Sequence, residues 1–316
     1  MRGKRLPLLS GGNSRASAGF GVICRAVRPS PTESGLNSRA PGVTLTPMLL
    51  EFTKMNGAGN DFILVDNRAG AVPLSRDQIV RLCDRHRGVG ADGVVILVPC
   101  ASGKADWAWE FFNSDGSIGE MCGNGSRCFA RFVQQRTGLK DTLTFETLAG
   151  VITARFQGGL VSVNLTSPVD LRLDQRVPLA EGVQSIHSVN TGVPHAVLFV
   201  PDADQALVLK LGPEIRRHAH FAPRGTNVNF VQVLGPGSIR VRTFERGVEG
   251  ETLACGTGVT ASALISARVH GFGSPVKVRV QGGEDLEVSF REREGQFTEV
   301  CLTGPAEFAF EGRIDF

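Results

Sequence analysis

The sequence predicts an α+β protein of two pseudo-symmetric domains, each a strand-rich shell around a central helix. The stretches CGNGSRCFARF (122–132) and CGTGVTASALI (255–265) each place a cysteine and Gly-x-Gly before an apolar helical pattern, with the cysteines 133 residues apart. Asn60 in NGAGNDFIL and His195 in NTGVPHAVL mark a second match, 135 residues apart. Two pairs of similar segments with nearly the same separation in the sequence indicate an internal duplication. The cleft between such domains is the expected ligand site.

The first half is predicted to alternate strands with two helices. Residues 49–67 have the pattern of a strand, a Gly/Asn turn and a second strand. Ser75 and Gln78 form a capping-box start for a helix over 75–86. Strand patterns then precede and follow the helix that starts at Cys122, at 93–98, 107–113, 143–147, 150–156 and 160–165.

The second half repeats this order loosely. The stretch 170–182 is the expected crossover between the halves, and a second helix is predicted over 255–271. Strand patterns occupy 195–200, 227–233, 238–245, 275–280, 285–290 and 298–302. The predicted organisation is a leader (1–47), an N-terminal domain (48–167), a C-terminal domain (168–302) and a strand that returns to the body (303–316).

Residues 1–47 are excluded from the fold prediction. They carry seven basic residues and one acidic residue, a net charge of +6, so the rest of the +3 chain is mildly acidic at −3. An Arg-rich, Ser-rich and acid-poor segment is typical of a transit peptide, although an unstructured extension or a true start at Met48 explains it equally well. We expect a cytoplasmic protein, or one in the plastid stroma if the leader is a transit peptide.

Charge and hydropathy exclude two classes of partner. The acidic body has no basic stripe, so no nucleic-acid partner is predicted. No run of about 18 apolar residues occurs, so no membrane partner is predicted either. The seven cysteines include no C-x-x-C pair, which disfavours zinc fingers and thioredoxin-type sites and favours a reducing compartment. Four of them are expected to be small apolar residues of the core: Cys83, Cys100, Cys128 and Cys301.

The two cysteine-led helix starts carry the chemistry. A helix N-terminus has unpaired N–H groups and a partial positive charge, so each Cys-Gly-x-Gly start is an anion site with a thiol beside it. That location is expected to lower the thiol pKa. If the two thiols faced one α-amino acid, one could take the α-proton and the other could protonate the opposite face. No nucleotide, metal or pyridoxal motif is evident, so we expect no cofactor.

Several motifs together resemble the diaminopimelate epimerase family. They are KMNGAGNDF, FNSDGS with MCGNGSRCFARF, RGTNVNF, and FERGVEGETLACGTGVTASA, and the resemblance extends from about Leu49 to the end of the chain. It implies cofactor-independent conversion of LL-2,6-diaminopimelate to the meso form in lysine biosynthesis. It also implies a homodimer, formed through the C-terminal strands near Phe310.

The resemblance also assigns roles to residues. Cys122 and Cys255 would be the two acid/base thiols, with ionisation tuned by His195 and Glu245. Asn60 would orient the reacting end of the substrate. The remaining substrate contacts would be Gly123, Asn124, Gly256 and Thr257 at the helix tips and Asn113, Asn227, Glu245 and Arg246 at the distal end.

Each of these polar residues also has an ordinary explanation. Asn60 could cap a turn, Glu245 and Arg246 could be a solvated pair, and His195 could be an exposed turn residue. Two positions depart from the family pattern: Val193 stands where many members have Asn, and Gly93 where Gln is frequent. Two other functions stay open, a proline or hydroxyproline racemase and, in a different class, a thiol-disulfide redox or binding protein.

Overall fold

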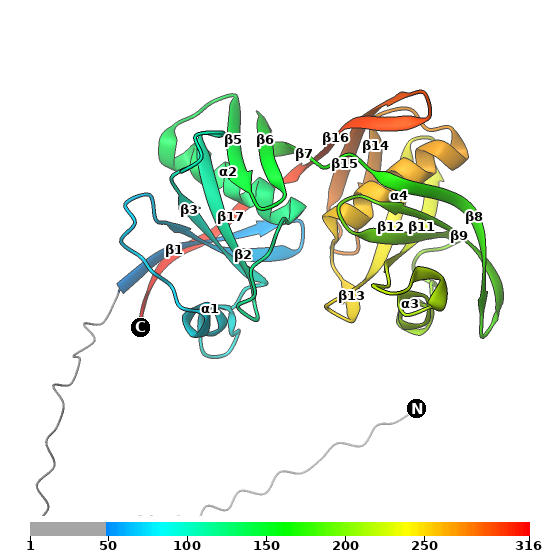
Figure 1. The fold of residues 1–316 in the computed structure, drawn as a ribbon, viewed down its shortest axis with the longest axis horizontal. Coiled ribbons are helices and arrows are strands. Elements are labelled where there is room, and N and C mark those ends of the chain that lie inside the picture. Colours follow the sequence, from blue (N-terminus) through cyan, green and yellow to red (C-terminus); the bar gives the residue numbers. More distant parts are fainter. Residues whose placement is uncertain (1–48) are drawn as a thin grey trace, which may run out of the picture. The chain divides into compact units, whose positions relative to one another are not determined.

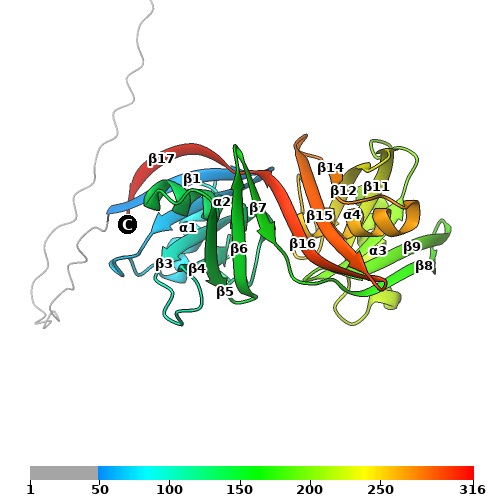
Figure 2. The same ribbon diagram turned by 90° about the horizontal axis from the view of Figure 1, so that it is seen from above.

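The computed structural model describes residues 49–316, and the expected leader lies outside the described residues. The described chain forms two lobes of strands, each around one long helix (Figures 1 and 2). The N-terminal lobe consists of β1 (Leu49–Gly57), β2 (Asn60–Asp66), α1 (Arg76–Cys83), β3 (Gly93–Val98), β4 (Trp107–Asn113), α2 (Gly123–Thr137), β5 (Thr142–Thr147), β6 (Gly150–Gln157), β7 (Leu160–Asn164) and β17 (Glu307–Asp315).

The C-terminal lobe contains the other strands and helices. They are β8 (Val169–Leu179), β9 (Gly182–Asn190), β10 (Pro194–Phe199), α3 (Val208–Arg216), the 3₁₀ helix η1 (Ala219–Phe221), β11 (Asn227–Gly235), β12 (Ser238–Glu245), β13 (Gly250–Thr252), α4 (Gly256–His270), β14 (Val276–Arg279), β15 (Asp285–Arg293) and β16 (Gln296–Pro305).

Strand pairing repeats between the lobes. The order β17–β1–β2–β3–β4–β5–β6–β7 has the same sequence of antiparallel and parallel pairs as β8–β9–β10–β11–β12–β14–β15–β16. The parallel steps are β2–β3 and β4–β5 in one lobe and β10–β11 and β12–β14 in the other. Helices α1 and α3 fill the first parallel crossover of their lobes, and α2 and α4 the second. The predicted two-domain fold class is therefore confirmed.

The central helices form because their apolar residues have shell strands to cover on several sides. Helix α2 packs against β1, β2, β3, β6 and β7. Its Phe129 also meets Phe145 of β5, with ring centroids 4.7 Å apart. Helix α4 packs against β9 to β12 and against β14 and β15. It is built of small and aliphatic residues and is buried along most of its length. Burial of these side chains is the main stabilising contribution to each lobe.

The two lobes are connected by strands. β7 pairs antiparallel with β16, which joins the shells into one sheet of seventeen strands. The chain then leaves the C-terminal lobe, and β17 pairs with β1 in the N-terminal lobe. This course is visible in Figure 2, where the C-terminal segment crosses from one lobe to the other. The domain boundaries at 167/168 and 302/303 stay a prediction.

Two local expectations differ from the structure. The stretch 170–182, expected as a crossover, belongs to the β8–β9 hairpin, whose register shifts near Arg172. Helix α3 was not predicted, because Pro213 lies inside it and no capping side chain marks its start at Leu207. The capping box of α1 is present as predicted, with both hydrogen bonds between Ser75 and Gln78 formed.

Candidate active site

Both predicted thiols cap a helix. Cys122 is the N-cap of α2 and Cys255 the N-cap of α4, each with an extended backbone. Both helices have fifteen residues and end at a glycine in the left-handed conformation, Gly138 and Gly271. The duplication therefore extends to the ends of the helices. In both copies the cysteine occupies the position whose side chain is closest to the free N–H groups.

The two helix tips meet. A Cβ atom built on Gly256 would lie 3.6 Å from Cα of Gly123 and 3.4 Å from Oδ1 of Asn124. Leu302, on the strand that joins the lobes, borders both glycines. Because the positive ends of two helix dipoles point toward one place, a bound anion there would be stabilised from both sides.

A cavity of about 800 Å³ lies between the lobes beside these tips. It brings together five of the predicted residues: Asn60, Asn113, Cys122, Glu245 and Arg246. Cys255, His195, Asn227 and the helix-tip residues do not line it, and Cys255 is only 7% exposed. The second thiol therefore lies behind the wall of this cavity in the described conformation.

Burial changes the expected ionisation of both thiols. Burial raises the pKa of Cys122, the Gly125 N–H opposes this, and the Glu245 carboxylate raises the pKa further. Burial likewise raises the pKa of Cys255, again with Glu245 adding to the effect. The expectation of lowered thiol pKa values is wrong for this conformation, because removal from water outweighs the donors at the helix tip.

Cys255 differs from Cys122 in its hydrogen-bond partner. Sγ of Cys122 accepts from the Gly125 N–H at 3.4 Å, whereas Sγ of Cys255 lies 3.5 Å from Oγ1 of Thr257. That hydroxyl is 2.9 Å from Nε2 of His195. A hydroxyl can accept from one partner and donate to another. Thr257 therefore connects His195 to the sulfur of Cys255.

The side chain of Asn229 determines which ring nitrogen of His195 carries the proton. Nδ2 of Asn229 donates to the carbonyl of Ala196 at 3.0 Å and lies 3.2 Å from Nδ1 of His195. Because an amide nitrogen only donates, Nδ1 must accept and Nε2 carries the proton. Full burial lowers the pKa of His195 to about 3, so the ring is neutral. The ring donates to Thr257, which leaves the threonine hydroxyl proton for Cys255.

Of the residues predicted for the distal end of a substrate, Asn227 and Glu245 lie on the paired strands β11 and β12, Arg246 follows β12, and Asn113 ends β4 in the other lobe. Oδ1 of Asn227 accepts from the Arg246 N–H at 2.8 Å, and Nδ2 of Asn227 donates to the Pro194 carbonyl at 3.2 Å. Oε2 of Glu245 accepts from Thr252 at 2.9 Å, and burial raises the pKa of Glu245. Arg246 forms no ion pair with a described residue. Its guanidinium donates from Nη1 to the Arg224 carbonyl at 3.3 Å and keeps further N–H groups for a carboxylate in the cavity.

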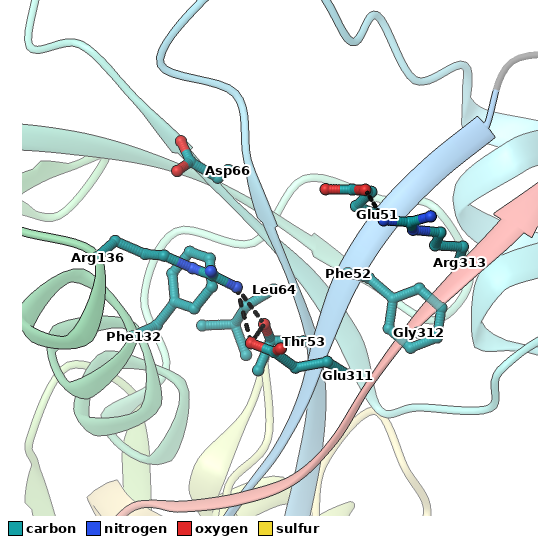
Figure 3. A pocket seen from close by; sticks show the side chains of 10 residues that line it. All are labelled: Glu51, Phe52, Thr53, Leu64, Asp66, Phe132, Arg136, Glu311, Gly312 and Arg313. Atoms are coloured by element: carbon teal, nitrogen blue, oxygen red, sulfur yellow. Dashed lines mark hydrogen bonds and ion pairs between the residues drawn. The ribbon is translucent and has the colours of Figure 1, made fainter.

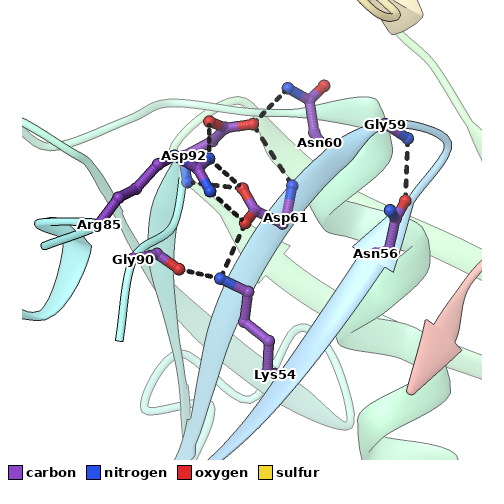
Figure 4. A network of polar contacts seen from close by, with 8 residues as sticks. All are labelled: Lys54, Asn56, Gly59, Asn60, Asp61, Arg85, Gly90 and Asp92. Carbon is purple, nitrogen blue, oxygen red and sulfur yellow. Dashed lines mark hydrogen bonds and ion pairs between the residues drawn. The ribbon is translucent and has the colours of Figure 1, made fainter. Parts of the chain in front are cut away.

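Asn60 belongs to a polar network rather than to an isolated turn. Its Nδ2 donates to Asp92 at 2.8 Å (Figure 4), and its Oδ1 accepts from Asn124 at 2.6 Å. Arg85 binds Asp61 through two hydrogen bonds and also reaches Asp92 at 3.0 Å. Asn60, Asp92 and Arg85 all line the cavity.

The two departures from the family pattern have structural correlates. A Cβ atom at Gly93 would lie 2.6 Å from the Phe112 carbonyl and 2.8 Å from the Phe111 ring, so β4 would have to shift for any side chain there. Val193 is half-buried and its carbonyl accepts from the Thr191 N–H. The side-chain oxygen of Asn190 accepts from the Gly192 N–H within this turn.

Sequence reasoning missed three residues of this site. Asn229 lies in the recognised motif RGTNVNF, whereas Asp92 lies in none of the quoted motifs, and both have partners far away in the sequence. Arg127 lies in the CGNGSRC motif and is fully buried, with hydrogen bonds to Gly123, Asn124, Gly57 and Pro305. A charged residue within an apolar helical pattern was the available signal, because an arginine is rarely buried without bonded partners.

The other cysteines have ordinary surroundings. Cys83 and Cys128 are buried as predicted, and burial raises the pKa of each to about 12. Cys100 and Cys301 are only half-buried, so the prediction of core positions is wrong for them. The six described cysteines are free thiols, and Cys24 lies outside the described residues. Within residues 49–316 no helix is long and apolar enough to span a membrane.

A second cavity, of about 480 Å³, lies on the N-terminal lobe between α2, β1 and β17 (Figure 3). None of the predicted residues lines it. Arg136 in its wall donates to Glu311 at 2.9 Å and to Thr53 at 3.1 Å, so its polar groups bind one another. The cavity between the lobes is therefore the candidate active site.

Comparison with known families agrees with this geometry. The family model described as diaminopimelate epimerase matches residues 52–169 and 187–309. The unmatched residues 170–186 fall in the β8–β9 hairpin. The chain is 45% identical over 278 residues to diaminopimelate epimerase of Aquifex aeolicus (strain VF5), and 43% identical over 277 residues to that of Hydrogenobaculum sp. (strain Y04AAS1). Each match covers 84% of this chain and 98% of the relative.

Solved structures of other proteins have the same fold. A phenazine biosynthesis protein of the PhzF family from Bacillus anthracis matches with a TM-score of 0.64 at 15% identity, covering 84% of this chain and 99% of that one. A probable proline racemase from Agrobacterium radiobacter K84 matches with a TM-score of 0.63 at 19% identity, covering 84% and 92%. At such identities the likeness concerns the fold alone.

Proposed function

Because this chain belongs to the diaminopimelate epimerase family, we propose that it inverts one stereocentre of LL-2,6-diaminopimelate to give the meso form in lysine biosynthesis. The observation that carries the proposal is the meeting of two cysteine-capped helix tips beside a single cavity. For a substrate α-carbon to have one sulfur on each face, the wall that covers Cys255 in the described conformation must open when the substrate binds. Inversion requires that arrangement.

The reaction needs one thiolate and one thiol. The thiolate takes the α-proton from one face, which breaks the C–H bond and leaves its electron pair on the α-carbon. The opposite thiol gives its proton to the other face, forms the new C–H bond and becomes the thiolate. The two sulfurs have exchanged roles, and neither the substrate nor the pair of thiols has gained or lost a proton overall. Because burial raises the pKa of both thiols, one of them must give up its proton before or during substrate binding.

The helix tips would bind the reacting carboxylate. Backbone N–H groups of Gly123, Asn124, Gly256 and Thr257 would donate to it, and the aligned dipoles would stabilise the negative charge that develops at the α-carbon. A water-excluded site increases this effect, which is consistent with the burial of Cys255.

The residues around the far part of the cavity suit a second amino-acid end. Arg246 can bind a carboxylate in a bidentate manner, and Glu245 together with the amides of Asn113 and Asn227 can accept from an ammonium group. This set favours diaminopimelate over proline, which has no second charged end.

Incubation with LL-diaminopimelate in D₂O tests the proposal. We expect deuterium at the inverted α-carbon and formation of the meso isomer without added cofactor. Dialysis against EDTA should leave this activity unchanged, because the thiols perform both proton transfers. Exchange into proline alone would support the racemase alternative. Full activity of both Cys122→Ser and Cys255→Ser would contradict the two-thiol mechanism and favour a redox or binding role.

We also propose a homodimer formed through β17. Phe310 on this strand is 51% exposed, and Phe308 on the same strand is also exposed, which suits an apolar interface. Sedimentation equilibrium should give twice the chain mass, and Phe310→Glu should give the monomer. A cytoplasmic location is proposed, or the plastid stroma if residues 1–47 are a transit peptide; the intact mass of the native protein distinguishes the two.

A further inference from the structure

We propose that Arg127 and Asp92 are positioning residues that fix the direction of two linked side-chain amides, Asn124 and Asn60, at the reacting end of the site. The inference rests on the proposed function, because it concerns how Asn60 is presented to the substrate. Neither Arg127 nor Asp92 has to touch the substrate for this role.

The four residues form one continuous chain of hydrogen bonds. Nη2 of Arg127 donates to Oδ1 of Asn124 at 3.0 Å. Nδ2 of Asn124 donates to Oδ1 of Asn60 at 2.6 Å. Nδ2 of Asn60 donates to Oδ2 of Asp92 at 2.8 Å. The chain thus runs from behind the α2 helix tip to the wall of the cavity, where Figure 4 shows its last bond.

The direction of this chain follows from its two ends. A guanidinium can only donate, so the oxygen of Asn124 must face Arg127. A carboxylate can only accept, so the nitrogen of Asn60 must face Asp92. Reversing either amide would bring two donors or two acceptors together. Both amides are therefore held in one orientation without any contribution from a ligand.

Each end is itself held in place. Arg127 is fully buried and also donates to the backbone carbonyls of Gly57, Gly123 and Pro305, so it cannot rotate without losing several bonds. At the other end, the carboxylate of Asp92 also accepts from Arg85 at 3.0 Å and from the Asp61 N–H at 3.4 Å.

Fixing the amides has a consequence for the substrate. Nδ2 of Asn60 has two hydrogens, and Asp92 is its one hydrogen-bond acceptor within the described residues. Asn60 lines the cavity, so its second hydrogen is left for an acceptor on a bound ligand. A reversed amide would present an oxygen instead and would repel a carboxylate or a developing negative charge. The chain therefore sets the donor character of Asn60 in advance of binding.

A double-mutant cycle in kcat/KM tests the inference. Asp92→Asn places a group that can donate as well as accept beside Asn60, and Arg127→Lys keeps the positive charge but loses the fixed fork of donors. We expect each to lower kcat/KM about tenfold, since each removes a hydrogen bond that involves a charged group. The double variant should lose clearly more than a hundredfold, because either end alone still sets the direction of the two amides and only the combined change weakens both restraints.

Stability is the second readout of the cycle. Arg127 and Asp92 share no hydrogen bond with each other, so their effects on the free energy of unfolding should be additive. Matched controls are Arg136→Lys on the same helix and Asp66→Asn in the exposed pair with Arg68; both should keep kcat/KM within about twofold.

An additive cycle in kcat/KM, with a loss of about a hundredfold in the double variant, would overturn the inference. So would a loss in stability that is as non-additive as the loss in activity, because that would indicate a purely structural role. If Arg127→Lys does not fold, Asn124→Ser takes its place in the cycle with Asp92→Asn, and the couplings in kcat/KM and in stability are judged in the same way. Wild-type deuterium exchange into diaminopimelate, measured first, separates a failure of this inference from a failure of the proposed function.

Discussion

Replacing Thr257 with valine should shift the pH dependence of the reaction. The hydroxyl of Thr257 is 3.5 Å from the sulfur of Cys255 and lowers the pKa of that thiol against the effect of burial. His195 occupies the acceptor side of the hydroxyl at 2.9 Å, so its proton is directed to the sulfur. Valine keeps the shape of the side chain but removes the donor.

The size of the effect follows from the type of bond. A hydrogen bond to an ionised group contributes roughly 1.5–3 kcal/mol. Its loss raises the thiol pKa, so the thiolate fraction at a fixed pH below that pKa falls about ten- to hundredfold. At pH 7 we therefore expect kcat/KM of Thr257→Val to fall by about that factor. The activity of the variant should continue to rise with pH beyond the range in which the wild type has levelled off.

Two measurements separate ionisation from structure. The pH profile of kcat/KM is recorded for Thr257→Val and for Thr257→Ser, which keeps the hydroxyl and should retain the wild-type profile. Ultraviolet absorbance of the thiolate is then titrated in the Cys122→Ser and the Cys122→Ser/Cys255→Ser backgrounds, and the difference between the two titrations isolates Cys255 from the other cysteines. A wild-type profile for Thr257→Val, or an equal shift for both variants, would refute the assignment of the hydroxyl as a donor to the sulfur.

Three further outcomes are expected. Cys122→Ser and Cys255→Ser should each lower kcat about 10²–10⁴-fold in deuterium-exchange assays, because each removes one acid/base group; an effect of only one of them would contradict the two-thiol mechanism. Gly258→Ala would place a Cβ atom 2.3 Å from a buried amide oxygen, so it should lower the free energy of unfolding by about 1–3 kcal/mol in urea. Gly159→Ala, with open space around it, is the control. The free energy of unfolding should fall as pH decreases from 6.5 toward 3, because the pKa of His195 is about 3 in the folded chain and 6.5 for the free side chain, so that unfolding takes up a proton in this range. His195→Gln should reduce the dependence of the free energy of unfolding on pH, measured by denaturant titrations at several pH values. An unchanged dependence would contradict this expectation.

The parts of the site that are local in sequence could be predicted. The Cys-Gly-x-Gly starts, the capping box of α1 and the repeat distance all depend on residues within a few positions of one another. They predicted helices capped by Cys122 and Cys255 and a fold made of two similar lobes. Periodicity and capping preferences act over one turn of helix or one strand, so a single sequence suffices to detect them.

Properties that depend on tertiary contacts could not be predicted. The direction of the thiol pKa shifts depends on how much of the shell covers each helix tip, and burial outweighs the effect of the helix N-terminus. The roles of Asp92 and Asn229 depend on partners brought by neighbouring strands. The β8–β9 hairpin was mistaken for a connection because its polar, Pro-containing segment lacks a clean alternation. Such features depend on strand register and packing, which no short motif determines.

The passage of the last strand from one lobe to the other has a consequence for how the chain can be divided. A cut after β16 would leave β1 as an open edge with unpaired backbone groups and exposed apolar side chains, a template for aggregation. It would also disturb Pro305, whose carbonyl accepts from Arg127 behind the first thiol. Gene fragments that encode either half should therefore yield insoluble products, and a premature stop codon near the 3′ end should cost the enzyme its activity although both cysteines are still translated.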